Sequence, residues 1–379
     1  MAIDITTLLK VIQEKVGTAN TSNTTTQELI DLLKAAKVTS YGSLIESYAS
    51  TSNLPTASSS SKRIAFVEDI RTVYLNDGSN WKQWDVTVPD AVLAYSFQGS
   101  NYGYTSGGWA PPNVNTIDKF PFSADGNATD VGDLTTARDQ TTGQSSSDYG
   151  YTSGGGPVYS NVIDKFSFSS DGNATDVGDL TASRKQSAGQ SSSDYGYTSG
   201  DRTDTNTYNT TIDKFPFATD GNATDVGDLT VGRAAAAGQS SSDYGYTSGG
   251  FNPYSNVIDK FPFATDANAT DVGDLTVARN QVAGQSSSDY GYTSGGIPTN
   301  TTIDKFPFAT DANATDVGDL SLGRYATAGQ SSTDYGYTSG GVTPARNTID
   351  KFPFSADANA TDVGDLTQAR GYGPAGQQY

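Results

Sequence analysis

The stretch Thr141–Arg184, TTGQSSSDYGYTSGGGPVYSNVIDKFSFSSDGNATDVGDLTASR, decides the fold because near-identical copies of it fill most of the chain. The strings YGYTSG and NATDVGDL recur with it. Six copies of about 46 residues therefore run from about residue 92 to the C-terminus. The string IDKF marks them at Ile117, Ile163, Ile212, Ile258, Ile303 and Ile349.

Each copy holds four short segments separated by turn residues. The first, TTGQSSS, is small and polar, the second alternates Tyr and Gly, the third is the aromatic VIDKFSFS, and the fourth, ATDVGDL, follows a turn at Asp171-Gly172-Asn173. Four-stranded repeats of this length build β-propellers, in which the first strand is crowded near the axis and favours Gly and Ser. We predict a mainly β fold, a six-bladed propeller over residues 91–379. A solenoid of the same units is the structural alternative.

The repeats resemble kelch repeats in three features. A Gly pair closes the second segment at Gly154-Gly155, the third segment is aromatic, and Arg184 precedes the next first segment. Kelch repeats carry a Trp on the outer strand, where this chain has ATDVGDL, so blade packing is expected to differ there. The tail GYGPAGQQY (371–379) repeats the inner-strand text AGQ, and we expect it to close the ring.

The N-terminal ninety residues follow another pattern. Apolar residues at helical spacing over 5–16 and, after a capping box at Thr25, over 29–36 predict two amphipathic helices, with a third, shorter one at 44–48. Residues 51–62 form a Ser-rich linker, and residues 63–90 a β-hairpin module that turns at 76–78. We expect residues 1–50 to be a helical attachment or oligomerisation region, since such helices cannot bury their apolar faces alone.

The hairpin text RIAFVEDIRTVYLNDGSNWKQWD (63–85) resembles a module of bacteriophage virion proteins that joins an attachment region to a distal domain. The segment YSFQGSNYGYTSGG (95–108) and the near-identical units are similar to propeller-bearing virion proteins of marine tailed phages. This resemblance implies a structural protein of a tail fibre or of a head or tail appendage, located in the virion. It would be held as a homo-oligomer by other virion proteins through its N-terminal region, and its propeller would bind a host-surface glycan or protein.

The composition removes several classes of function. The chain has no His and no Cys, so it cannot hold a Ser/His/Asp or Cys/His nucleophile or the usual zinc site. Its formal net charge is −19, and this field disfavours nucleic acid and anionic lipid as partners. No apolar stretch has the length of a secretion signal or of a membrane span, so we expect synthesis in a cytoplasm and no membrane insertion. No cofactor is predicted.

Acidic and Asn side chains recur at fixed places in every copy. The pattern at Asp125, Asn127 and Asp130 could hold calcium, but it lacks the Gly and the Glu of an EF-hand loop, and turn capping explains it better. The pair Asp130 and Asp133 allows a glycosidase, yet an active site needs an asymmetric group of residues and these pairs occur in all six copies. We predict no catalytic residues and no metal site.

The copies differ between the Gly pair and IDKF, and directly after the repeat Arg, where the text reads DQTT, KQSA, AAAA, NQVA and YATA. In an up-and-down blade these two regions emerge at one end, so we predict a variable binding face there; drift in unconstrained loops is the alternative.

Three functions from different classes follow: the phage virion protein, a cytoplasmic kelch-like interaction scaffold, and a carbohydrate-active enzyme. Aromatic and cationic residues of the variable regions are the predicted contacts: Trp109, Tyr159, Arg202, Tyr208, Phe251, Tyr254, Tyr325 and Arg346.

Overall fold

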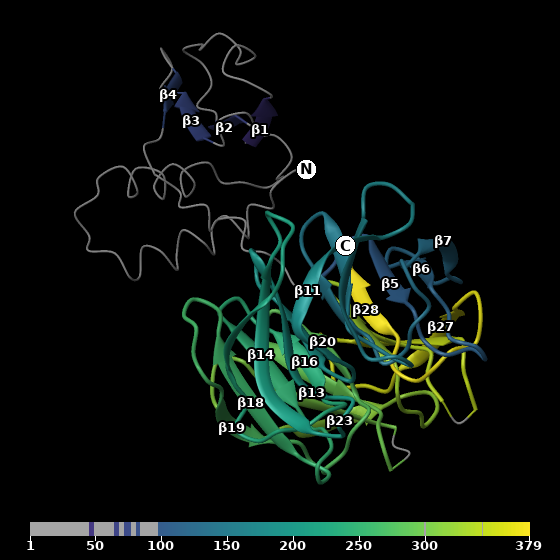
Figure 1. The fold of residues 1–379 in the computed structure, drawn as a ribbon. Coiled ribbons are helices and arrows are strands. Elements are labelled where there is room, and N and C mark those ends of the chain that lie inside the picture. The colour runs from purple at the N-terminus through teal and green to yellow at the C-terminus, as the bar shows by residue number, and fades with distance from the viewer. Residues whose placement is uncertain are drawn as a thin grey trace. The chain divides into compact units, whose positions relative to one another are not determined.

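The computed structural model describes residues 98–298, 301–342 and 344–379, together with the backbone of four strands between residues 45 and 83 (Figure 1). The chain divides into two compact units, Met1–Leu93 and Ala94–Tyr379.

The first unit contains a sheet in the order β1-β2-β3-β4. Its strands are β1 (Ile45–Tyr48), β2 (Ile64–Val67), β3 (Thr72–Asn76) and β4 (Trp81–Gln83). The predicted hairpin is confirmed, since Asn76 pairs with Trp81 across its turn. The short helix predicted at 44–48 is wrong: Ile45–Tyr48 pair in parallel with Ile64–Val67, so tertiary pairing overrides a weak helical pattern. The helices predicted at 5–16 and 29–36 and the linker at 51–62 lie outside the described residues.

The second unit is a six-bladed β-propeller, as the repeats predict. Its six four-stranded antiparallel sheets follow one another around a ring (Figure 1). Five of the sheets use consecutive strands, from β8 to β27, and the sixth has the order β28-β5-β6-β7. The blades are numbered here from that sheet, which is blade 1.

The inner strands approach one another backbone to backbone. A Cβ atom added at Gly143 would lie 2.1 Å from the carbonyl oxygen of Gly376, and one at Gly238 would lie 2.1 Å from that of Gly189. Only Gly fits here, which explains the small first segment of each repeat. The inner strands are β8 (Thr142–Ser145), β12 (Ala188–Ser191), β16 (Ala237–Ser240), β20 (Ala283–Ser286), β24 (Ala328–Ser331) and β28 (Ala375–Gln378).

The second strands carry the YGYTS text, and their two Tyr residues differ in exposure. Tyr151 is buried and stacks on Phe217 of the next blade at 4.8 Å, whereas Tyr149 is 38% exposed under the ammonium of Lys165. Only the second Tyr of each strand therefore belongs to the core. These strands are β5 (Tyr102–Ser106), β9 (Tyr149–Ser153), β13 (Tyr195–Arg202), β17 (Tyr244–Ser248), β21 (Tyr290–Ser294) and β25 (Tyr335–Ser339).

The third strands are buried between neighbouring blades on both faces. Ile163, Asp164 and Phe166 are all buried, because a bulge between Ile163 and Asp164 breaks the alternation of faces. The strands are β6 (Thr116–Pro121), β10 (Ser160–Ser167), β14 (Tyr208–Pro216), β18 (Val257–Pro262), β22 (Thr302–Pro307) and β26 (Thr348–Pro353).

Each outer strand, or the residue directly after it, adds one Leu to the core. In blade 2, Leu180 packs with Tyr151 and Ile163 against Phe215 and Ala223 of blade 3, and five further clusters of the same kind fill the other blade boundaries. The outer strands are β7 (Thr129–Asp133), β11 (Thr175–Arg184), β15 (Thr224–Asp228), β19 (Thr270–Asp274), β23 (Thr315–Asp319) and β27 (Thr361–Asp365).

The C-terminal strand closes the ring, as the sequence predicts. β28 pairs antiparallel with β5, with Ala375 opposite Ser106, and Figure 1 shows the yellow β28 beside the blue β5. Gln377 donates to Tyr151 O (2.9 Å) and to Thr152 Oγ1 (3.0 Å) of blade 2. First and last segments of the propeller thus share a blade, and that blade bonds to the next.

Candidate binding face

The two variable regions of each repeat lie at one end of the propeller, as the strand order predicts. Six antiparallel bridges join these regions. In each bridge, one residue directly follows the Arg that ends a repeat (the repeat Arg), and the other directly follows the Gly pair, or the equivalent residues, after a second strand. We call this end the variable face, and the opposite end, with the SSSD and DGNATD-type loops, the constant end. The bridged pairs are Trp109 with Gly371, Asp139 with Gly156, Lys185 with Arg202, Ala234 with Phe251, Asn280 with Ile297 and Tyr325 with Val342.

A closed belt of backbone hydrogen bonds surrounds the axis at the variable face. One residue per blade boundary has a left-handed backbone with φ between 52° and 62°, although none of the six is Gly. Each amide N–H of the belt donates to a carbonyl at the preceding boundary, for example Gln186 to Gln140 (3.0 Å) and Gln281 to Ala235 (2.7 Å). Six strained residues of this kind are held only where the surroundings impose the conformation. They are Gln140, Gln186, Ala235, Gln281, Ala326 and Tyr372, with the N–H at the last boundary supplied by Gly373.

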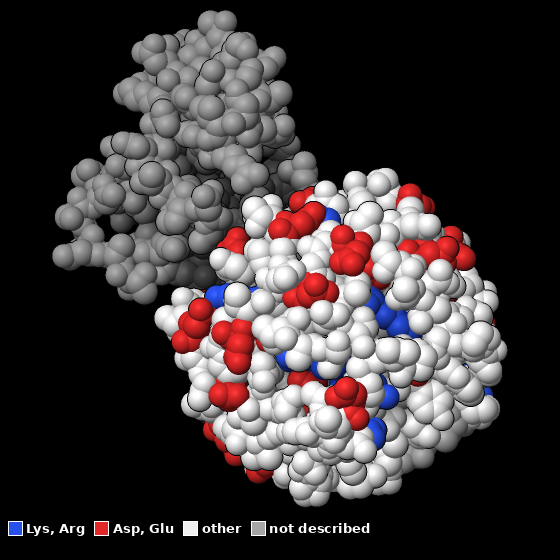
Figure 2. Space-filling view, viewed as in Figure 1, with Lys and Arg blue, Asp and Glu red and all other residues white. Residues whose placement is uncertain are grey.

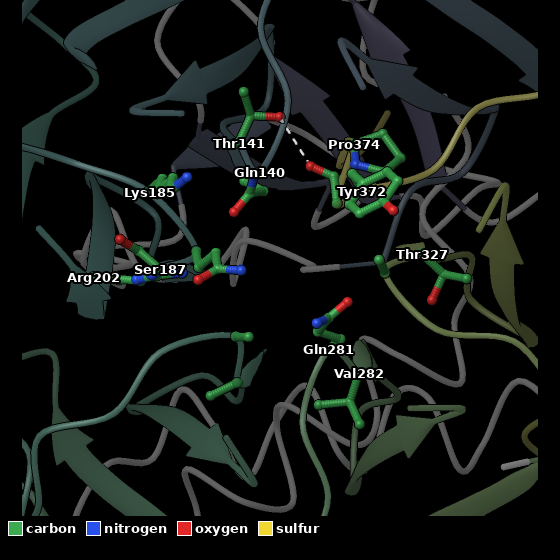
Figure 3. Close-up of a pocket in the computed structure, with 15 residues that line it drawn as sticks. Gln140, Thr141, Lys185, Ser187, Arg202, Gln281, Val282, Thr327, Tyr372 and Pro374 are labelled. Atoms are coloured by element: carbon green, nitrogen blue, oxygen red, sulfur yellow. Dashed lines mark hydrogen bonds between the residues drawn. The ribbon is translucent and has the colours of Figure 1, made fainter. Parts of the chain in front are cut away.

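The belt encloses a cavity of about 320 Å³, which we call the mouth cavity. Figure 3 shows Gln140 and Gln281 extending toward its middle from opposite sides, with Lys185 and Arg202 on one flank and Tyr372 on another. Its volume lies at the lower end of the range of small-ligand sites, about 300–1,000 Å³. Amide, hydroxyl, cationic and aromatic groups line it: Gln140, Gln186, Gln281, Thr141, Ser187, Thr327, Lys185, Arg202 and Tyr372, besides Ala235, Ala236, Val282, Ala326, Gly373 and Pro374.

The eight predicted contacts do not form one group. Trp109 meets the ring of Tyr372 edge-on at 5.1 Å, and Tyr159 lies under the ammonium of Lys185 at 4.7 Å. Of the eight, only Arg202 lines the mouth cavity.

The remaining predicted contacts lie over the later blades. Tyr208, Phe251 and Tyr254 form a chain of edge-on rings at 5.7 and 5.5 Å, and Phe251 and Tyr254 are 36% and 45% exposed. Tyr325 is bridged to Val342, and Arg346 bonds through its backbone N–H to Gly341.

The residues two positions after each repeat Arg line the mouth cavity and were not among the predicted contacts. Gln140, Gln186 and Gln281 occupy the same position in three of the boundaries, and Tyr372 occupies it in a fourth. The recurring Gln in DQTT, KQSA and NQVA was the available signal. The role of this Gln could not be predicted, because a left-handed backbone at Gln leaves no mark in the sequence.

Most cations of the propeller are paired within the repeats. Each repeat Arg is buried and forms an ion pair with the Asp of the IDKF strand in the neighbouring blade, for instance Arg233 with Asp259 at 3.2 Å. Burial lowers the pKa of Arg233, and the charge of Asp259 opposes that shift. The other pairs are Arg138–Asp164, Arg184–Asp213, Arg279–Asp304, Arg324–Asp350 and Arg370–Asp118.

The Lys of each IDKF strand pairs at the constant end. Lys260 reaches Asp311 of the next blade at 2.5 Å and covers the ring of Tyr244 at 5.0 Å. Five other Lys residues do the same, which leaves Lys185, Arg202 and Arg346 as the cations outside these two sets in the described part of the propeller. All three belong to the variable face. Elsewhere on the propeller surface in view, acidic side chains are scattered widely (Figure 2).

The recurring Asp and Asn side chains serve contacts between blades. Asp171 pairs with Lys119 at 2.5 Å, and Asn173 Oδ1 accepts the N–H of Asp133 at 3.1 Å. Asp176 accepts the N–H of Gly178 within its own strand. In the part of the chain that the structure describes, no three His, Cys, Asp or Glu side chains gather as a metal site would need. The local bond of Asp176 agrees with the turn interpretation, whereas Asp171 and Asn173 bond to the preceding blade.

Comparisons with known proteins give no family. No protein-family model matches the chain, and no curated protein is significantly similar to it. Across the described ranges, no helix has the length and apolarity to cross a membrane. The resemblances to kelch repeats and to phage virion proteins stay predictions.

Proposed function

We propose that this chain is a phage virion protein, a tail fibre or a head or tail appendage, whose propeller binds the host surface through its variable face. One observation carries the proposal. Six blades repeat nearly identical packing, whereas the loops at one end differ in length and chemistry. A rigid platform with individual loops at one end suits recognition, because the framework holds the contacts in place before binding.

The chain enters the propeller at the end opposite the variable face. Gln98 Nε2 donates to Ser286 O (3.1 Å), and Gly99 N–H donates to Ser331 O (2.8 Å). Both acceptors lie at the constant end of inner strands, so the chain enters the propeller there.

The N-terminal region would make the contacts with other virion proteins. Residues 5–16 and 29–36 carry apolar residues at helical spacing, and such stripes are stabilised by packing on a partner or on sister copies. We propose a homo-oligomer in the particle and assign no catalytic step and no cofactor to the chain. The six-fold repetition of its carboxylate pairs favours binding over catalysis.

A cytoplasmic interaction scaffold is the second candidate, and the aromatic chain favours it. Tyr208, Phe251 and Tyr254 form a partly exposed surface of the kind that protein interfaces use. Such a scaffold would use the same face, so the two candidates differ in where the chain is found.

The test is immunogold labelling of purified phage particles with an antibody against the full chain. The proposal expects gold on a fibre or appendage of particles that encode this chain, and none on particles in which its gene is deleted. Label confined to the infected cell, with bare particles, would exclude the virion and leave the scaffold.

A further inference from the structure

We propose that the mouth cavity binds a saccharide that carries a carboxylate, with Lys185 and Arg202 holding that carboxylate. This inference rests on the proposed function and names the ligand class of the same face.

The belt fixes the positions from which the cavity side chains extend. Five of the six belt residues are held by hydrogen bonds to both neighbouring boundaries, for instance Gln186 N–H to Gln140 O (3.0 Å) and Ala235 N–H to Gln186 O (2.7 Å). Left-handed backbone at non-Gly residues recurs at sites where strain serves function. A ligand in this cavity would therefore contact side chains whose backbone is already fixed by the belt before binding.

Two cations lie side by side on one flank of the cavity. The backbones of Lys185 and Arg202 are joined by two hydrogen bonds of 3.2 and 3.0 Å, and Arg202 ends strand β13, where it pairs with Tyr208. Arg202 donates Nε and Nη2 to the neutral oxygen Asn206 Oδ1. Among the described residues neither cation forms an ion pair, so their charge is available to an anion.

The surroundings of Lys185 disfavour its charged form, and a bound anion would favour it. Burial lowers its pKa, the charge of Asp139 opposes that change, and Arg202 adds to it. Its position over the ring of Tyr159 at 4.7 Å fixes the direction of the side chain. A carboxylate placed between Lys185 and Arg202 would relieve the repulsion between the two cations.

The rest of the lining suits sugar hydroxyl groups. The amides of Gln140 and Gln281 extend inward from opposite sides (Figure 3), and each amide both donates and accepts hydrogen bonds. Thr327 Oγ1 is buried and has no hydrogen-bond partner among the described residues. Tyr372, 41% exposed and braced by Trp109, offers an aromatic ring at the rim.

The overall charge of the protein favours a ligand with a single negative charge over a polyanion. The chain carries a net charge of −19, which repels extended anions, and two cations can balance a single carboxylate. Asn206 occupies the Nε and Nη2 edge of the Arg202 guanidinium, and the Nη1 and Nη2 end offers donors to a carboxylate. A sugar acid thus fits both the charge and the polar lining.

The experiment is saturation-transfer difference NMR and titration of the full chain with galacturonate, glucuronate and N-acetylneuraminate, with galactose and glucose as neutral counterparts and acetate as a plain carboxylate. At least one sugar acid should bind about tenfold or more tightly than its neutral counterpart and than acetate. Equal binding of acidic and neutral sugars, or no binding of any sugar acid, would overturn the proposal.

Lys185→Gln and Arg202→Gln should each weaken binding of that sugar acid by about tenfold, since each removes a charged hydrogen-bond donor. Lys119→Gln at the constant end is the matched control and should leave binding unchanged. If Arg202→Gln does not fold, Lys185→Gln alone decides. Unchanged affinity in Lys185→Gln would refute the assigned role of the cations.

Failure of this inference and failure of the proposed function are separable. Sugar-acid binding by the purified chain needs no virion, so it can hold even if particles carry no label. Conversely, labelled particles that attach to host cells through a chain with no affinity for sugar acids would retain the function and reject the ligand.

Discussion

The buried Arg–Asp pairs join each blade to the next with two charges that water does not reach. Arg233 Nη2 lies 3.2 Å from Asp259 and also donates to Thr247 O at 2.9 Å, while Asp259 accepts the N–H and the hydroxyl of Thr230. The sequence showed the repeat Arg as a kelch-like mark but not its partner. The bulge that turns the IDKF Asp inward is set by pairing between strands, which the single repeat does not display.

Replacing Arg233 by Met should lower the free energy of unfolding by about 3–5 kcal/mol, because Asp259 stays buried without its counter-charge. Lys260→Met is the control: its pair with Asp311 is solvent-exposed on the Asp side, and its loss should cost less than about 1 kcal/mol. Urea denaturation measures both. Equal costs would contradict the importance assigned to the buried pair.

The buried Tyr residues predict loss of stability in alkali. Burial raises the pKa of Tyr246, Tyr292 and Tyr337 from 10 to about 12, and it raises that of Tyr104, Tyr151 and Tyr197 as well. These Tyr residues ionise at lower pH in the unfolded chain than in the folded one. Their contribution to the free energy of unfolding is therefore complete below pH 10 and is lost as the pH rises toward 12. With six such groups the free energy of unfolding falls by up to roughly 8 kcal/mol per pH unit.

Urea midpoints by circular dichroism between about pH 8 and pH 11.5 test this, and they should fall steeply above about pH 10. A midpoint that stays constant across that range would contradict the burial of these phenols.

The inner strands depend on Gly at their second position. A Cβ at Gly238 would lie 2.1 Å from the carbonyl oxygen of Gly189. Gly238→Ala should therefore force the inner strands apart locally and lower the free energy of unfolding by about 3 kcal/mol. Gly221→Ala is the matched control, because a Cβ there meets nothing within 4 Å and the equivalent positions of other copies are already Ala267, Ala312 and Ala358. Thermal melting of both variants decides: similar melting temperatures would refute the close approach of inner strands.

At the level of elements, the sequence predicted the strands of the propeller well and the site less well. Repetition, Gly pairs and Asp-Gly-Asn turns separate the four strands of a unit, and their order alone places both variable regions at one end. The lining of the mouth cavity could not be predicted in the same way. It depends on left-handed backbone at Gln140, Gln186 and Gln281, and that conformation is imposed by the closed belt rather than by the residues.

For the whole molecule, ring closure by β28 carries a prediction of its own. Deleting Ala375–Tyr379 leaves β5 as an exposed edge, removes the Gln377 bonds and removes the stack of Tyr379 on Phe168 at 5.3 Å. The melting temperature should fall by about 5 °C or more, with a tendency to aggregate. A Gly-Ser extension after Tyr379 is the control and should melt like the parent chain. Unchanged melting after the deletion would mean that closure does not depend on β28.

Recognition through the variable face is the central claim, and particle attachment tests it most directly. Particles carry either Trp109→Ala, Tyr208→Ala and Tyr254→Ala together, or the same kind of change at exposed tyrosines of the constant end, Tyr149→Ala, Tyr244→Ala and Tyr290→Ala. Aromatic hot spots contribute about 2 kcal/mol each, roughly 30-fold in affinity. The variable-face set should therefore lose attachment to host cells at least about 30-fold, while the constant-end set attaches like the parent. Equal loss in both sets, or no loss in either, would contradict the claim.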